Sequence, residues 1–180
     1  MPTYISILRG INVSGKNLIK MDALKKMFEN LQFKNIQTYI QSGNIIFSTQ
    51  SNSVKSLETK IASQIKKDFG FDVLVIVLTA EKLRGIIQQN PFTKDKQKDI
   101  SYLYVTFLTD SPNEFDIKGI LEKRSAGEEI EFGKNAIYLF CPGGYGQTKL
   151  NNNFLESKLK VNATTRNWKT ANELLKLATL

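Results

Sequence analysis

Ile36-Gln37-Thr38-Tyr39-Ile40-Gln41-Ser42-Gly43-Asn44-Ile45-Ile46-Phe47-Ser48 is the stretch of sequence that decides the fold. Apolar and polar residues alternate on both sides of Ser42-Gly43, which predicts two strands joined by a tight hairpin. One face of the hairpin carries Ile36, Thr38, Ile40, Ile45 and Phe47, and the other carries Gln37, Tyr39, Gln41, Asn44 and Ile46. The second face either packs on the rest of the chain or stays open, as in RNA-recognition motifs, although the basic and aromatic signature of those motifs is missing.

The flanking segments complete a β-α-β-β-α-β order in the first half of the chain. Residues 4–8 and 72–78 are short apolar runs typical of strands. Apolar residues recur at helical spacing over 21–31 and over 53–69. This order is the ferredoxin-like arrangement, with helices on one sheet face. The right-handed crossover predicts the strand order 4-1-3-2, which places the strand at 43–48 beside the strand at 3–8.

The second half repeats this α+β character without a visible sequence repeat. A short helix near 80–89 ends at Asn90-Pro91-Phe92, and the polar run 93–99 is interpreted as a linker or exposed loop. We therefore expect two ferredoxin-like halves with antiparallel-containing sheets, 1–92 and 93–180, or one compact unit. The expected elements of the second half are a strand at 102–108, a helix near 115–121, a hairpin of 129–132 and 136–140, and C-terminal helices near 151–160 and 167–178. Thr164 or Thr165 is the expected cap of the last helix, and Trp168 is expected in the core.

Composition excludes several classes of protein. The 180-residue chain has no histidine and one cysteine, which excludes a Cys/His zinc site and the usual base of serine and cysteine hydrolases. No apolar run approaches the roughly 20 residues that span a bilayer, and the apolar run at 4–8 is too short for the h-region of a signal peptide and has no basic residue before it. We therefore expect a cytoplasmic protein with no membrane partner, no metal and no cofactor. The net charge of +8 permits binding to phosphates, but the lysines are scattered and also suit an ordinary soluble surface.

Polar loops at one edge of the first predicted sheet form the first candidate site. Gly10-Ile11-Asn12-Val13-Ser14-Gly15-Lys16 has P-loop spacing, but Asn17 replaces the magnesium-binding hydroxyl and four residues separate Lys16 from the predicted helix. The topology brings this loop to the hairpin turn, so two sets of residues should approach each other: Arg9, Asn12, Lys16 and Asn17 from the loop, and Gln41, Ser42 and Asn44 from the hairpin. Such a cluster can bind a phosphate or carboxylate, or it can tie the two loops together by mutual hydrogen bonds.

Two further segments are candidate anion sites. The glycine-rich run from Cys141 to Lys149 joins a strand to a helix, so its N–H groups and the Lys149 ammonium can meet an anion. Arg166 and Asn167 are expected to project at the start of the last helix, where an anion is favoured, although structural capping also explains this motif. Cys141 itself is interpreted as a buried apolar residue.

These motifs together resemble the bacterial domain-of-unknown-function family 1697. The resemblance runs through Leu8-Arg9-Gly10-Ile11-Asn12-Val13, Gly15-Lys16-Asn17, Tyr39-Ile40-Gln41-Ser42-Gly43-Asn44, Phe47, Asn90-Pro91-Phe92, Tyr145-Gly146, Lys149-Leu150, Thr164-Thr165-Arg166-Asn167-Trp168 and Thr170. It implies a compact α+β protein of ferredoxin-like halves and transfers no catalytic residue.

Three functions remain open from the sequence. The leading hypothesis is a binding module for a small phosphorylated or anionic ligand, or for a nucleic-acid backbone. The second is a histidine-free enzyme on a phosphorylated substrate, with Lys16 or Lys149 as the electrostatic catalyst and an unassigned Asp or Glu as the base. The third is a structural or partner-binding protein.

Overall fold

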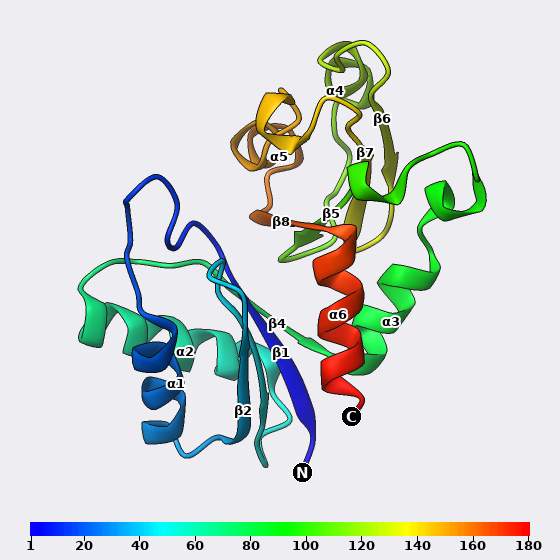
Figure 1. The fold of residues 1–180 in the computed structure, drawn as a ribbon. Coiled ribbons are helices and arrows are strands. Elements are labelled where there is room, and N and C mark those ends of the chain that lie inside the picture. Colours follow the sequence, from blue (N-terminus) through cyan, green and yellow to red (C-terminus); the bar gives the residue numbers. More distant parts are fainter. The chain divides into compact units, whose positions relative to one another are not determined.

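The chain folds into two compact units, each built on a four-stranded antiparallel sheet (Figure 1). The computed structural model describes all 180 residues. The first unit comprises Met1–Leu83 with Leu174–Leu180, and the second comprises Arg84–Glu173. The chain is therefore an α+β protein of two halves.

The first unit has the β-α-β-β-α-β order expected for residues 1–79. Its elements are β1 (Thr3–Leu8), α1 (Met21–Asn30), β2 (Lys34–Tyr39), β3 (Asn44–Ser48), α2 (Val54–Phe69) and β4 (Val75–Thr79). The sheet order is β2-β3-β1-β4, and β3 lies beside β1 with Tyr4 opposite Phe47. The predicted order 4-1-3-2 is confirmed.

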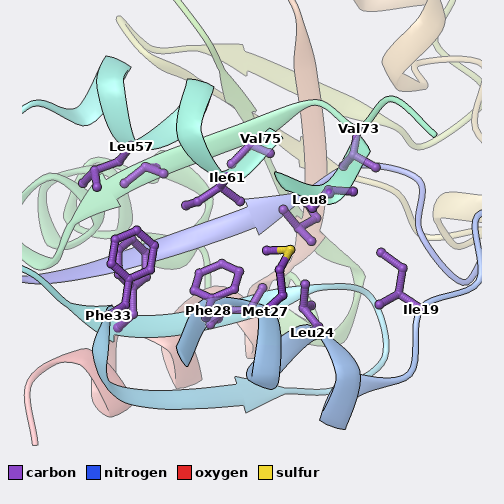
Figure 2. Close-up of a cluster of buried hydrophobic side chains, with 14 of the residues drawn as sticks. Leu8, Ile19, Leu24, Met27, Phe28, Phe33, Leu57, Ile61, Val73 and Val75 are labelled. Carbon is purple, nitrogen blue, oxygen red and sulfur yellow. The ribbon is translucent and has the colours of Figure 1, made fainter. Parts of the chain in front are cut away.

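Helices α1 and α2 cover the same face of the first sheet (Figure 1). Ser53 caps α2 by accepting from the Ser56 N–H, and Gly70 ends this helix in the left-handed conformation. Figure 2 shows the core between these helices and the sheet, into which both layers send large apolar side chains: Leu8, Ile19, Leu24, Met27, Phe28, Phe33, Leu57, Ile61, Val73 and Val75. The hairpin face carrying Ile45 and Phe47 points into this core, as the alternation predicts.

The other face of the first sheet is buried over β1, β3 and β4. Its apolar side chains Ile5, Ile7, Ile46, Ile76 and Leu78 are almost fully inaccessible to solvent. On β2 of the same face, Gln37 is exposed and Tyr39 is half-buried. The face therefore lacks the broad open surface on which RNA-recognition motifs stack bases.

The second unit repeats the topology of the first. Its elements are β5 (Leu103–Leu108), α4 (Ile117–Glu122), β6 (Glu129–Phe132), β7 (Ala136–Phe140), α5 (Asn152–Leu159) and β8 (Ala163–Asn167), with the sheet order β6-β7-β5-β8. Short 3-10 turns lie at Pro91–Lys94, Ile100–Tyr102 and Tyr145–Gln147. Apolar residues of α4 and α5, among them Ile120 and Leu155, share one core with the sheet residues Leu108 and Leu139.

A helix follows the fourth strand of each half without a loop. Helix α3 (Ala80–Gln88) starts directly after β4, and α6 (Trp168–Ala178) starts directly after β8. The last strand residue caps the helix in both cases: Thr79 accepts from the Lys82 N–H at 3.1 Å and Asn167 accepts from the Thr170 N–H at 2.8 Å. None of the helices is both long enough and apolar enough to cross a membrane.

Strand β8 corrects the expectation that Thr164 or Thr165 caps the last helix. Both threonines lie in the strand, where they pair with β5, and Asn167 is the cap. Threonine suits a strand as well as a cap, and the absence of an apolar run hid the strand from periodicity. Trp168, with only 8% of its surface exposed, is buried as expected.

The polar segment 93–99 is fixed to the second unit. Lys98 bridges Asp95 at 3.0 Å and Glu129 at 2.6 Å, and its ammonium lies 5.1 Å from the ring centroid of Phe140. These acceptors raise the pKa of Lys98, because both hydrogen bonds favour its charged form. The segment therefore lies on the surface of the second unit. Its polar composition alone is equally compatible with a linker.

Candidate functional site

The loop after β1, Arg9–Lys20, has an unusual backbone. Five of the eight residues from Gly10 to Asn17 have positive φ, between 50° and 70°, and all of them except the adjacent pair Ser14 and Gly15 are separated by residues without positive φ. Asn12, Ser14 and Asn17 are among them although they carry side chains, and such a conformation is uncommon outside glycine. Consecutive residues of opposite φ sign turn their N–H groups toward one side of the chain.

Asn12 holds this loop closed. Its side-chain oxygen accepts from the Ile19 N–H at 2.8 Å, and its side-chain nitrogen donates to the Ile19 carbonyl at 2.9 Å and to the Gln41 carbonyl at 2.8 Å. The loop therefore meets the β2–β3 hairpin, as the topology predicts. The Asn12 amide is occupied inside the chain, which supports the interpretation of this residue as a tie between two loops.

The hairpin turn packs closely against the start of the loop. The Leu8 N–H donates to the Gly43 carbonyl at 2.9 Å, and Gly43 has φ +83°. A Cβ at this glycine would lie 2.6 Å from Ile11 Cδ1 and 2.9 Å from Leu8 Cβ, so no larger residue fits without movement. The neighbouring Asn44 is buried and donates to the Tyr39 carbonyl at 3.0 Å and to the Ser42 hydroxyl at 2.9 Å.

Several polar groups of the loop remain directed to solvent. The N–H groups of Ser14, Gly15 and Asn17 donate to no acceptor within the chain, whereas the Lys16 N–H donates to the Val13 carbonyl at 2.9 Å. The side chains of Lys16 and Lys20 are exposed and form no ion pair. The Asn17 side chain donates to the Gly10 carbonyl at 3.2 Å, Gln41 is exposed, and Arg9 is half-buried. This edge of the first unit is rich in donors and cationic.

The P-loop interpretation does not hold. Helix α1 begins at Met21, so Gly15 and Lys16 are not at its N-terminus. The helix dipole and the free N–H groups of its first turn are thus separated from the loop, whereas a P-loop directs both at the phosphates.

The glycine-rich loop after β7 is internally hydrogen-bonded. The N–H groups of Gly144, Gln147 and Thr148 donate to carbonyls within the loop, and the Tyr145 N–H donates to the Tyr104 hydroxyl at 3.3 Å. Lys149 is exposed and lies two residues before Asn151, which caps α5. Most N–H groups of this loop are therefore unavailable to a ligand, in contrast to the loop Arg9–Lys20.

Arg166 does not project from a helix N-terminus, because it lies in β8 opposite Val105 and is buried. Its guanidinium donates to the Thr164 hydroxyl at 3.2 Å and to the Thr165 carbonyl at 3.0 Å. Burial lowers the pKa of Arg166 to about 10, since desolvation disfavours the charged form. Asn167 is exposed and serves as the cap of α6.

A cluster of hydroxyl groups that the sequence did not indicate surrounds Thr165. The Thr165 hydroxyl donates to the Asn152 side-chain oxygen at 2.7 Å and accepts from the Tyr145 hydroxyl at 3.2 Å, and it lies 2.8 Å from the Thr106 hydroxyl. Only knowledge that 163–167 is a strand would have placed Thr165 beside Thr106. The cluster joins the glycine-rich loop to the second sheet.

The lone thiol is inaccessible. Cys141 is fully buried, and burial together with the neighbouring Glu128 carboxylate raises its pKa to about 12. A thiol with such a pKa is protonated at neutral pH and is a poor nucleophile. No group of three Cys, Asp or Glu side chains is arranged to hold a metal ion.

Comparison with known proteins identifies the family. No curated protein matches the chain in sequence. The fold is similar to that of "conserved bacterial protein SP0830 from Streptococcus pneumoniae", with a TM-score of 0.72 and 24% sequence identity over 98% of each chain. A family model described as "Protein of unknown function (DUF1697)" matches residues 1–138, which include the whole loop Arg9–Lys20 and the hairpin. The chain therefore belongs to this family of proteins of unknown function.

Proposed function

We propose that the protein is a cytoplasmic binding module that holds a small phosphorylated or otherwise anionic ligand in the loop Arg9–Lys20. The observation that carries the proposal is the positive φ at five of the eight residues from Gly10 to Asn17, most of them next to a residue without positive φ. Backbones of this kind present several N–H groups to one anion. Lys16, exposed at the same loop, adds a point charge to which a phosphate oxygen can hydrogen-bond.

The distribution of charge supports the same edge. The first unit carries twelve lysines and arginines against six carboxylates, whereas the second carries thirteen against eleven. No carboxylate precedes Asp22 in the chain. An anion is therefore attracted to the first unit, and the loop has no neighbour in sequence that repels it.

Binding is favoured over catalysis at this loop. A phosphoryl or ester substrate needs a general base within hydrogen-bond reach of the attacking group. Residues 1–21 contain no Asp, Glu or His, and the residues 40–44 of the hairpin contain none either. The loop thus supplies donors and positive charge without a residue that can accept the proton.

Calorimetric titration with pyrophosphate at low ionic strength tests the proposal. We expect Lys16→Ala to weaken binding by roughly tenfold, the loss of one charge-assisted hydrogen bond. The matched control is Lys25→Ala, which removes the same charge from an exposed site on α1 and should leave the affinity within about twofold. Equal weakening by both variants, or no measurable binding to the parent protein, would contradict the proposal.

A further inference from the structure

Three residues with exposed aliphatic side chains lie next to the backbone groups that the Asn12 side chain joins. Val13, Leu18 and Ile40 are 55%, 67% and 48% exposed. Each is one residue from a group joined by the Asn12 side chain: Val13 follows Asn12, Leu18 precedes Ile19, and Ile40 precedes Gln41. The hydrogen bonds of Asn12 therefore bring the backbone at these three residues to one edge of the first unit, the edge that carries Lys16.

Folding does not account for this arrangement. The core of the first unit is filled by other residues of the same segments, including Ile11 and Ile19. Ile40 also adopts φ +52°, a conformation that a β-branched residue rarely tolerates. A strained and exposed isoleucine contributes little to stability, and strain of this kind is typical of binding sites.

We infer that the phosphate bound by this loop is carried on an aliphatic chain, so that the natural ligand is a small, water-soluble alkyl phosphate. The inference rests on the proposed function: the N–H groups and Lys16 hold the phosphate, and Val13, Leu18 and Ile40 contact the hydrocarbon. The loop 9–20 and the turn 40–43 contain no aromatic residue on which a base could stack, and Tyr39, which precedes the turn, is half-buried. Apolar contact with an alkyl chain is the interaction that these side chains can make.

The test compares inorganic phosphate, hexyl phosphate and adenosine monophosphate by titration against the parent protein. Hexyl phosphate should bind at least roughly tenfold more tightly than inorganic phosphate, because burying a few methylene groups is sufficient for that ratio. Adenosine monophosphate should bind no more tightly than inorganic phosphate.

Leu18→Ser should abolish the preference for hexyl phosphate while leaving the affinity for inorganic phosphate unchanged. The matched control is Ile100→Ser, which removes an equally exposed aliphatic side chain in the second unit and should alter neither affinity. Circular dichroism and the thermal midpoint of both variants verify that they are folded.

Three results would overturn the inference. The first is equal affinity of the parent protein for hexyl and inorganic phosphate. The second is tighter binding of the nucleotide, and the third is binding of phosphatidic acid vesicles without binding of soluble hexyl phosphate. If inorganic phosphate still binds and Lys16→Ala removes that binding, the proposed function stands although the inference fails; if no phosphate compound binds, both fail.

Discussion

Gly43 is the residue at which backbone conformation and packing constrain the candidate site most strongly. Its positive φ and its contact with Ile11 fix the distance between the hairpin and the loop Arg9–Lys20. Asn12 and Asn44 then bond to main-chain and side-chain atoms of the same two segments. At the residue scale, these amides join the loop to the hairpin, and Lys16 with the loop N–H groups that have no acceptor forms the proposed anion site.

Gly43→Ala should destabilise the protein by about 2–5 kcal/mol, because the left-handed backbone costs roughly 1–2 kcal/mol and the overpacking roughly 1–3 kcal/mol. Gly70→Ala is the matched control, since Gly70 has φ +86° but no atom within 4 Å of its Cβ position. Urea denaturation should show the larger loss for Gly43→Ala. Equal losses for the two variants would mean that the contact with Ile11 has no energetic consequence.

Ile40→Asn should raise the free energy of unfolding by roughly 1 kcal/mol, because asparagine tolerates the left-handed region and the isoleucine is half exposed. The denaturation midpoint of this variant measures the change. A lower midpoint would show that the packing of Ile40 outweighs its backbone strain.

At the scale of elements, the sequence predicted those strands and helices whose apolar residues alternate or recur at helical spacing. The two hairpin strands, the helices of the first half and the order 4-1-3-2 are confirmed, but the turn spans the four residues 40–43 instead of Ser42-Gly43, so that Tyr39 pairs with Asn44. Strand β8 was missed because Thr164, Thr165 and Arg166 carry no apolar period, and its burial is created by neighbours distant in the chain. The sequence could likewise place the loop beside the hairpin. It could not show which of their side-chain amides are hydrogen-bonded within the chain, because those bonds also depend on neighbours distant in the chain.

Asn167→Ala should cost about 1 kcal/mol of stability, which is the usual loss when a helix cap is removed. Thr164 does not cap the helix, so no such loss is expected at that residue. Thermal denaturation followed by the fluorescence of Trp168, the single tryptophan, measures the effect beside this residue. No change in Asn167→Ala would indicate that the bond to the Thr170 N–H does not stabilise α6.

At the scale of the whole molecule, the two halves share one topology without sharing a sequence pattern. The edge strands show the same device: the Val77 N–H of β4 donates to Glu58 of α2 at 3.0 Å, and the Ala163 N–H of β8 donates to Glu156 of α5 at 3.3 Å. A carboxylate on the second helix of each half thus occupies an N–H of one edge strand, β4 or β8, which discourages pairing with another chain at that edge. The halves differ in charge and in their loops, and only the first has an exposed loop in which five of eight residues have positive φ.

Stability should fall at alkaline pH through two buried acids of the second unit. Burial raises the pKa of Tyr138 from 10.0 to about 12 and that of Cys141 from 9.0 to about 12. The folded state holds both protons more tightly than the unfolded state. The contribution of the two groups to the free energy of unfolding is therefore complete below pH 9 and is lost as the pH rises from 9 to 12. Each group adds a slope of up to about 1.4 kcal/mol per pH unit. Tyr138→Phe should flatten the fall above pH 10 in denaturation curves, and an unchanged slope would contradict the assignment.

The central claim, that the loop Arg9–Lys20 binds anions through its main chain, is tested most directly by the amide resonances of ¹⁵N-labelled protein titrated with pyrophosphate. We expect saturable shifts at Ser14, Gly15 and Asn17, whose N–H groups have no acceptor in the chain. Lys16→Ala should weaken these shifts, and Lys25→Ala should not. Shifts that are absent from this loop, or that are spread evenly over the exposed lysines of α1 and α2, would contradict the account.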